Sequence, residues 1–244
     1  MKRVLFSLIF ILSASVVASA QTFYFPQIAA GDGWMTTIFL SNATADKVAS
    51  GTVTFTTSSG EPFNGHFVDT SWNNVANGNT IPFQIAPGQT AKYMAVADIP
   101  LTVGYARVTA NASVLGTAMF TLLDSNGGIV SEAGVPMSIP LGKQAVFVDT
   151  TNGFRTGVAI ANPNNASLDL NLELLDNNGQ VVARTVRVVA PFQHMAIFTD
   201  ELFPEAPAMV GRLQFWCTNP VVAVALRFSP WVQFTTMSPI VIAN

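Results

Sequence analysis

The feature that most constrains this chain is an internal duplication, because two stretches with the same order of landmarks must fold along the same plan. The stretch from Gly33 to Asn42 aligns with the stretch from Gly153 to Asn162. Later matches keep the same order, and only the segments between them change in length, as loops do. They pair Val53, Phe55 and Gly60 with Leu172, Leu174 and Gly179, Ile85-Ala86-Pro87 with Val189-Ala190-Pro191, and Met137-Ser138 with Met237-Ser238. The chain is therefore predicted to contain two domains of one kind, residues 21–141 and residues 142–244.

Both copies have the pattern of antiparallel β-structure. Short runs rich in Val, Ile, Thr and Phe are separated by Gly, Asn, Pro and Asp, and residues 124–127 and 176–179 are typical of hairpin turns. Helical periodicity is scarce, and only residues 199–204 favour a short helical turn. Many short strands in each copy of about a hundred residues predict an all-β chain of two tandem antiparallel β-sandwich domains, with a barrel as the alternative.

Alternation along the duplicated strands predicts the cores. Because successive side chains of a strand point to opposite faces, apolar positions that match between the copies are expected to point inward. Thr36 and Thr156 share an inward position, so their hydroxyl groups need hydrogen-bond partners, which we expect the backbone to provide. The matched apolar pairs are Trp34 and Phe154, Ile38 and Val158, Leu40 and Ile160, Val53 and Leu172, and Phe55 and Leu174.

Residues 1–20 have the three parts of a signal peptide. Two basic residues at positions 2 and 3 precede an apolar stretch that ends at Val17, and Ala18-Ser19-Ala20 is an A-x-A cleavage site. The apolar stretch is shorter than the roughly 20 residues of a membrane helix, and no later segment reaches that length without polar interruption, so no membrane span is expected after cleavage. The mature chain is predicted to begin at Gln21 and to be secreted to the extracellular space, the cell surface or the periplasm.

Composition argues against several classes of function. The 244 residues are 50% hydrophobic and 10% charged, with a formal net charge of −3, which excludes a disordered chain and gives no reason to expect a nucleic-acid partner. One Cys and 2 His leave little material for metal chemistry, so neither a metal nor a cofactor is expected. Cys217 lies in an apolar run and is expected to be a buried, inert thiol.

No catalytic residue is assigned, and the chain is not expected to be an enzyme. The acidic residues are scattered and most lie at predicted turns, where Asp is favoured for backbone hydrogen bonding. No nucleophile elbow, zinc-binding helix or phosphate loop is present. A small hydrolase stays an alternative only if two acidic side chains meet in one pocket. His66 and His194 belong to different copies, and each is expected to be structural.

The clearest candidate for a ligand-binding site is a loop that only the first copy contains, residues 64–80. It lies between Gly60 and Pro87, an interval longer than the matching one in the second copy. One aromatic residue among hydrogen-bonding side chains on a long loop is typical of a recognition surface. The alternative is an ordinary loop whose Trp closes one end of the sandwich. The candidate ligand-binding residues are His66, Asp69, Trp72, Asn73 and Asn74.

Two further tryptophans offer surface candidates. Trp216 follows Phe215 in a predicted strand, so one of the two side chains must point outward. Trp231 follows a Ser-Pro pair and is expected at the edge of the sandwich. Trp34, in contrast, is expected in the core because its counterpart is Phe154.

Several segments resemble a module that recurs in secreted bacterial proteins. The likeness spans nearly all of the mature chain and is carried by residues 25–34, 36–38, 131–136, 157–163 and 225–228. The resemblance implies immunoglobulin-like β-sandwiches, often appended to larger extracellular proteins. That family has no known activity, so no catalytic or binding residue is carried over. This chain departs from the pattern because it holds two copies without a visible enzyme domain.

Three hypotheses of function follow. The first is a secreted, non-enzymatic surface, adhesion or scaffold module whose partner is an extracellular polysaccharide or another surface protein. The second is a carbohydrate-binding module that uses the Trp72 loop. The third is a self-assembling surface subunit, because the apolar terminal segments 23–25 and 240–243 would pair across chains if left as open edges. The short connector, residues 139–143, predicts limited bending between the two copies.

Overall fold

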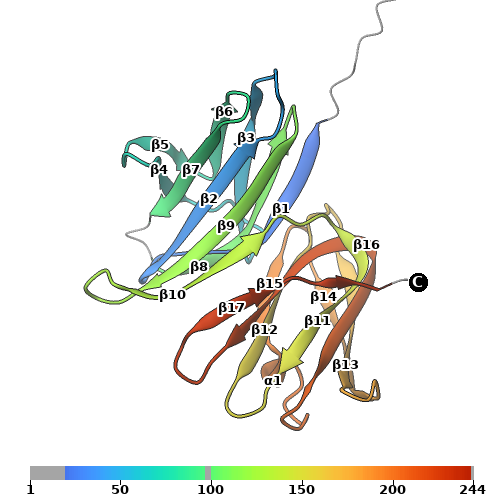
Figure 1. Ribbon diagram of the computed structural model, residues 1–244. Helices are drawn as coiled ribbons and strands as arrows, with labels where there is room; N and C mark the ends of the chain where they lie inside the picture. The colour runs from blue at the N-terminus through green and yellow to red at the C-terminus, as the bar shows by residue number, and fades with distance from the viewer. Residues whose placement is uncertain (1–19, 97–99, 243–244) are drawn as a thin grey trace, which may run out of the picture.

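The computed structural model describes residues 20–96 and 100–242, which form antiparallel strands and one short helix (Figure 1). The all-β prediction is confirmed, and the antiparallel sheets are consistent with a β-sandwich. The predicted signal peptide, residues 1–20, lies outside the described residues apart from Ala20. Among the residues described, no helix is both long enough and apolar enough to cross a membrane.

Residues 21–136 form two sheets that enclose one core. A four-stranded sheet has the order β1-β8-β3-β6, and a six-stranded sheet has the order β10-β9-β2-β7-β4-β5. Large buried aromatic and aliphatic side chains from both sheets fill the space between them. The strands are β1 (Gln21–Ala30), β2 (Trp34–Asn42), β3 (Ala49–Thr57), β4 (Gly65–Val68), β5 (Asn74–Gly78), β6 (Thr80–Ile85), β7 (Thr90–Val96), β8 (Thr102–Ala110), β9 (Val114–Leu123) and β10 (Ile129–Pro136).

Residues 141–241 supply the remaining strands, among which β16 takes part in two layers. Its first part pairs with β11 and β13, and its second part pairs with β12 and β17. A second core of buried side chains lies between these layers. The elements are β11 (Leu141–Asp149), β12 (Arg155–Ala161), β13 (Leu168–Asp176), β14 (Val181–Val189), β15 (His194–Phe198), α1 (Thr199–Leu202), β16 (Val210–Phe228), β17 (Phe234–Met237) and β18 (Ile240–Val241).

The pairing order of the first group of strands recurs in the second. The order β1-β8-β3-β6 corresponds to β11-β16-β13-β14, and β10-β9-β2-β7 corresponds to β17-β16-β12-β15. The single strand β16 therefore takes the places of both β8 and β9. The hairpin of β4 and β5, which lies within the predicted insertion at residues 64–80, has no counterpart among the described strands of the second group.

Two buried threonines connect neighbouring strands in the same way. The Thr36 hydroxyl donates to the carbonyl of Ala29 (2.7 Å) and accepts from the N–H of that residue (3.0 Å). The Thr156 hydroxyl makes the same two contacts with the backbone of Asp149, at 3.1 Å and 2.9 Å. The expectation that backbone groups satisfy these inward hydroxyls is confirmed. Each hydroxyl thus provides hydrogen-bond partners for the buried N–H and carbonyl groups of one residue on the preceding strand.

Eight of the ten predicted core positions are buried; Trp34 and Phe154 are half-buried, and only Phe154 lies outside a core. Phe154 precedes the first residue of β12 and lies half-buried beneath the guanidinium of Arg227, whose central carbon is 3.5 Å from the ring centroid. The prediction that Phe154 points into the core is therefore wrong, because the residue belongs to the turn and not to the strand. Trp34 packs half-buried against its core. The fully buried positions are Ile38, Leu40, Val53, Phe55, Val158, Ile160, Leu172 and Leu174.

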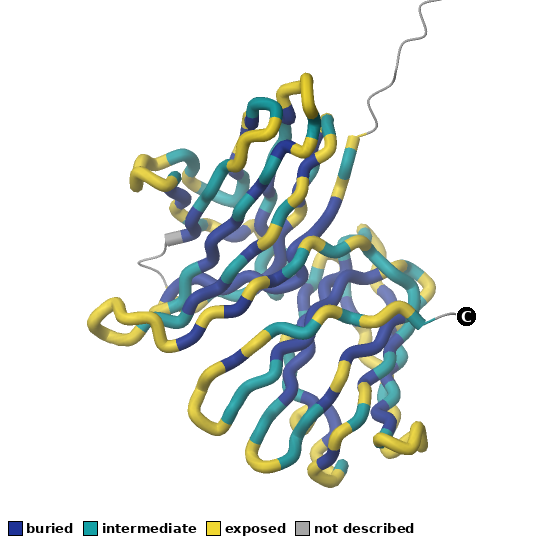
Figure 2. Tube along the Cα trace, viewed as in Figure 1, coloured by how far each residue is buried: buried dark blue, intermediate teal, exposed yellow. Residues whose placement is uncertain are grey.

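Three strand segments are buried on both faces, and they hold the two groups of strands together. Residues 23–30 of β1, 156–161 of β12 and 221–226 of β16 are buried without interruption (Figure 2). Although β1 ends its sheet, segment 23–25 is buried and Tyr24 exchanges backbone hydrogen bonds with Ser138, so this segment does not form the open edge that the self-assembly hypothesis needs there. Ile240 and Val241 are exposed, and residue 243 lies outside the described residues.

Alternation along β16 shows how one strand serves two cores. Val221, Ala223 and Ala225 belong to the core of residues 141–241. Val224 and Leu226 point the other way and join the core of residues 21–136. The contact between the two groups of strands is therefore apolar and continuous with both cores.

Phe234 of β17 crosses this contact and joins the core of residues 21–136. Its ring centroid lies 5.2 Å from that of Phe120 and 5.3 Å from that of Trp34. Its backbone N–H donates to the Ser131 hydroxyl at 3.0 Å. The side chain is anchored by stacking and the backbone by a buried hydrogen bond.

We expect Phe234→Ala to lower the free energy of unfolding by about 3–5 kcal/mol, because it removes a buried ring and leaves a cavity. Phe147→Ala is the matched control, since its ring is 56% exposed on β11 and its loss should change the same quantity by only about 0.5 kcal/mol. Urea denaturation followed by far-UV circular dichroism measures both. Equal losses in the two variants would contradict the assignment of Phe234 to the contact.

Candidate functional site

The predicted recognition loop, residues 64–80, forms a β-hairpin at the edge of the six-stranded sheet. Strand β4 pairs with β7 on one side and with β5 on the other, and β5 is the last strand of that sheet. The hairpin therefore extends the sheet. The alternative, in which Trp72 closes the end of the sandwich, is wrong because its side chain is 66% exposed.

The turn between β4 and β5 is organised by Asp69. Its carboxylate accepts hydrogen bonds from the backbone N–H of Ser71 (2.8 Å) and of Asn73 (3.0 Å), and from the side-chain amide of Asn73 (3.0 Å). The bonds from Asn73, with a smaller contribution from Ser71, lower the pKa of Asp69. The Asp69 carbonyl also accepts from the N–H of Trp72 at 3.1 Å. The turn is thus ordered by its own hydrogen bonds.

Trp72 occupies the tip of this turn with a positive φ of 62°. A non-glycine residue in the left-handed region is uncommon, and here the Asp69 contacts hold it in place. Asn74 follows at the start of β5, so Asp69, Trp72, Asn73 and Asn74 lie together. His66 lies further down the hairpin, where its Nδ1 is 2.9 Å from the side-chain oxygen of Asn77. The structure therefore brings four of the five candidate residues together and places the fifth apart.

A second candidate surface surrounds Trp216, which the sequence offered as a surface residue without indicating the side chains that accompany it. Phe215 is fully buried, and Trp216 points outward from β16. We define the Trp216 face as the outer surface of β11, β13 and β16 that carries Lys143, Asn171, Glu173, Gln214 and Trp216. Lys143 and Asn171 are the residues that face Trp216 across the two neighbouring strands.

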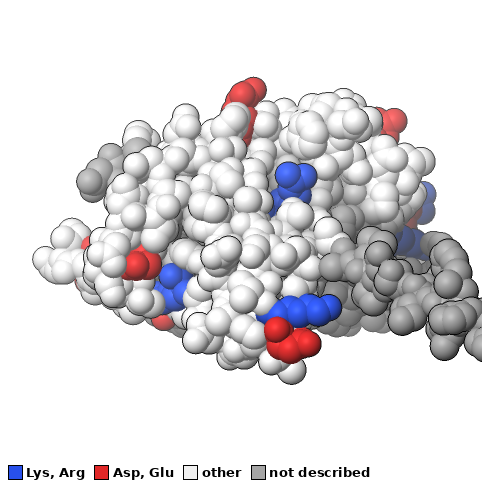
Figure 3. Space-filling view, turned by 90° about the horizontal axis from the view of Figure 1, so that it is seen from above, with Lys and Arg blue, Asp and Glu red and all other residues white. Residues whose placement is uncertain are grey.

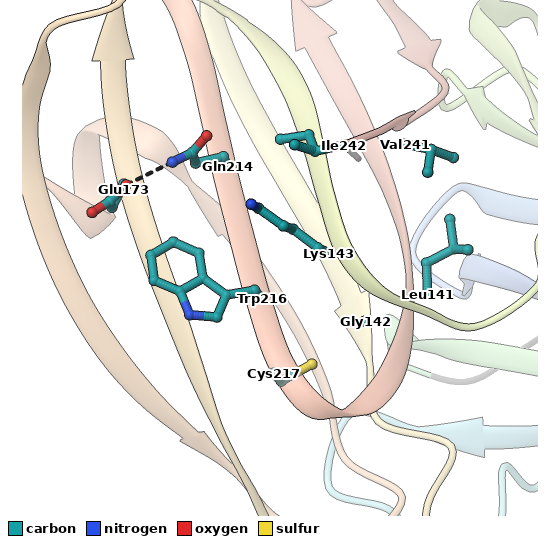
Figure 4. A pocket seen from close by; sticks show the side chains of 9 residues that line it. All are labelled: Leu141, Gly142, Lys143, Glu173, Gln214, Trp216, Cys217, Val241 and Ile242. Atoms are coloured by element: carbon teal, nitrogen blue, oxygen red, sulfur yellow. Dashed lines mark hydrogen bonds between the residues drawn. The ribbon is translucent and has the colours of Figure 1, made fainter. Parts of the chain in front are cut away.

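The Trp216 face is hollowed on both sides of the indole. One hollow, of about 670 Å³, extends to the C-terminal segment (Figure 4). A second hollow, of about 520 Å³, lies on the β13 side and is lined by Asp169, Asn171 and Thr218. The residues that line the first hollow are Leu141, Gly142, Lys143, Glu173, Gln214, Trp216, Cys217, Val241 and Ile242.

Hydrogen bonds fix the polar groups beside Trp216. Gln214 donates from Nε2 to Oε2 of Glu173 at 2.6 Å, and Arg184 contacts Oε1 of the same carboxylate through Nε at 2.7 Å. Both carboxylate oxygens are therefore occupied. In residues 20–96 and 100–242, no carboxylate lies within ion-pair distance of Lys143.

Cys217 borders both hollows and is half-buried. Burial raises the pKa of its thiol to about 11, which keeps the group protonated near neutral pH. Its Sγ lies 3.0 Å from the carbonyl of Asn219. These contacts are those of an inert thiol.

Two acidic side chains lie close together in α1. Arg155 binds both Asp200 (2.8 Å) and Glu201 (3.0 Å). Burial opposes the ionisation of Asp200, but the hydrogen bond and the charge of Arg155 outweigh it and lower the pKa of that carboxyl. The two carboxylates are therefore engaged with one guanidinium. Within the described part of the chain, no group of three or more His, Cys, Asp or Glu side chains could hold a metal ion.

His194 is buried where the two groups of strands meet. Its Nδ1 lies 3.0 Å from the Ser58 hydroxyl, and its backbone N–H donates to the carbonyl of the same residue at 3.2 Å. Nε2 has no partner in hydrogen-bonding geometry, although the backbone of Pro26 is near enough to favour the protonated ring slightly. Burial dominates and lowers the pKa of His194 to about 4. The structural role expected for this histidine agrees with its position.

No protein family model matches the chain, and no curated protein matches it. The geometry defines an antiparallel β-protein with an exposed tryptophan, Trp72, at the edge of one sheet and a half-buried tryptophan, Trp216, on the outer face of another. Charged groups are sparse on the face drawn in Figure 3, where a few basic and acidic side chains, some of them adjacent, lie in a largely uncharged surface.

We expect the stability of the protein to fall as the pH drops from about 6.5 to about 4, because the unfolded chain then binds a proton that folded His194 excludes. The contribution is complete above pH 6.5 and is lost with a slope of at most about 1.4 kcal/mol per pH unit. Urea denaturation at several pH values measures it. His194→Gln should remove this slope, and His66→Gln should leave it unchanged. A slope that persists in His194→Gln would refute the assignment.

Proposed function

We propose that this protein is a secreted, non-enzymatic adhesion module made of two tandem immunoglobulin-like β-sandwiches. The signal-peptide pattern of residues 1–20 supports export. The shared apolar contact between the two groups of strands supports a body that holds its surfaces in fixed positions. A scaffold of this kind can present a recognition element without chemistry of its own.

The duplication is supported by contacts that recur at matching positions. Besides Thr36 and Thr156, Asn42 and Asn162 are buried at the ends of β2 and β12. Each donates from Nδ2 to backbone carbonyls, to that of Ile85 (2.9 Å) in one case and that of Val189 (3.1 Å) in the other. Buried amides with equivalent partners are what two copies of one fold would retain.

The observation that carries the proposed function is the exposed indole of Trp72 at the tip of an ordered hairpin. A tryptophan presents a large apolar area with only two side-chain torsions to immobilise on binding. The Asp69 hydrogen bonds order the turn beforehand, which lowers the entropic cost of association. We therefore assign attachment to an extracellular surface to this hairpin.

Carbohydrate binding at the same hairpin is a second candidate, favoured by the side chains around the indole. Asn73 and Asn74 flank the tip, and amide groups donate to and accept from sugar hydroxyls. Trp72 would stack on a sugar ring. If the hairpin binds carbohydrate, the adhesion partner is a polysaccharide. The general adhesion hypothesis also allows a surface protein as the partner.

Self-assembly is a third candidate, and strand β14 favours it. This strand forms the edge of its sheet and has side chains exposed on both faces, including Val186 and Val188. An exposed apolar edge can pair with a strand of another copy. Sedimentation velocity of the mature chain tests this candidate: Val186→Lys should shift an oligomer to monomer, and a wild-type chain that stays monomeric at high concentration would remove it.

We expect Trp72→Ala to weaken binding of the mature chain to isolated bacterial envelopes at least about tenfold, because the variant loses the central aromatic contact. Trp231→Ala is the matched control, since Trp231 is 74% exposed on a different loop and should not affect binding. A co-sedimentation assay of chain with envelopes measures both.

Treatment of the envelopes separates the candidate partners. Periodate oxidation of the sugars should abolish binding if the partner is a polysaccharide, and protease treatment should abolish it if the partner is a protein. Wild-type binding by Trp72→Ala, or equal losses in the two tryptophan variants, would contradict the assignment to the hairpin.

A further inference from the structure

The Trp216 face combines an aromatic platform, fixed polar groups and Lys143, which has no carboxylate partner among residues 20–96 and 100–242. The indole lies half-buried between two hollows, so a chain-like ligand stacked on it can continue in both directions. Gln214, held by Glu173, keeps its carbonyl oxygen and one N–H available. Lys143 lies across from Trp216 on the neighbouring strand and lines the same hollow (Figure 4).

Charge selects the class of ligand. Arg184 and Gln214 each contact one oxygen of Glu173, and the Arg184 guanidinium offsets the negative charge of this carboxylate. The ammonium of half-buried Lys143 has no carboxylate partner among the described residues, so it is available to a carboxylate of a ligand, which would accept charge-assisted hydrogen bonds from it.

We propose that the Trp216 face binds a polysaccharide whose sugar rings carry carboxylates. The indole stacks against one ring, Lys143 pairs with the carboxylate of that ring or its neighbour, and Gln214 and Asn171 bind hydroxyl groups. An acidic peptide would match the charge of Lys143 but would offer no ring face to the indole. The site is separate from the Trp72 hairpin and does not depend on it.

The test uses the mature chain with polygalacturonate, alginate and hyaluronan, each compared with its methyl-esterified form, in affinity electrophoresis. Wild type should bind at least one acidic polymer and bind the esterified form about tenfold more weakly. Trp216→Ala should lose binding at least about tenfold. Trp216→Phe keeps a smaller platform and should retain part of the affinity, which separates loss of stacking from loss of folding.

Lys143→Gln should bind the acidic and esterified forms of the polymer equally. Trp72→Ala should bind as wild type does, so failure at the hairpin and failure at the Trp216 face are distinguishable. The proposal is overturned if none of the acidic polymers binds, if Trp216→Ala binds like wild type, or if Lys143→Gln keeps the preference for the acid form. Tighter binding of poly-glutamate than of every polysaccharide would also overturn it in favour of an acidic peptide.

Discussion

The rest of the structure depends on a stretch of β16 that must be covered on both faces. Residues 221–226 have no polar side chain, and alternate members enter different cores. A strand of this kind is stable only when apolar surface lies above and below it, because either exposed face would leave valines in water. The two groups of strands are therefore held together by the same burial that forms each core, and this contact fixes how their outer surfaces are presented.

Buried polar groups then determine how the strands align. Thr36 and Thr156 each form hydrogen bonds with both backbone groups of a single residue on the preceding strand. Asn42 and Asn162 donate to the carbonyls of the last residues of β6 and β14. A shift of register would leave these groups without partners in an apolar interior, which costs more than the contacts themselves contribute. Burial thus supplies the stability, and a few polar side chains select one arrangement.

Strand alternation could be predicted from the sequence, but the elements that pack against each strand could not. Alternation placed residues 53–55 and 172–174 correctly, because each alternates between a core and an outer face. Alternation could not show that residues 221–226 are buried on both faces, because an uninterrupted apolar run does not indicate which elements pack against it. Phe154 was misplaced because strand boundaries depend on the turn that precedes them. The length difference between the copies located the hairpin, yet the Asn-rich segment gave no alternation from which to predict strands.

Trp216 illustrates a further limit. The pair Phe215 and Trp216 required one outward ring, but only the pairing with β11 and β13 shows which one it is and which polar side chains accompany it. Both tryptophans lie where substitution leaves the cores untouched: Trp72 is exposed in the turn of a hairpin whose Phe67 enters the core, and Trp216 lies on the outer side of its sheet. Recognition at these surfaces can therefore vary independently of the packing, because the interactions that stabilise the fold are made elsewhere.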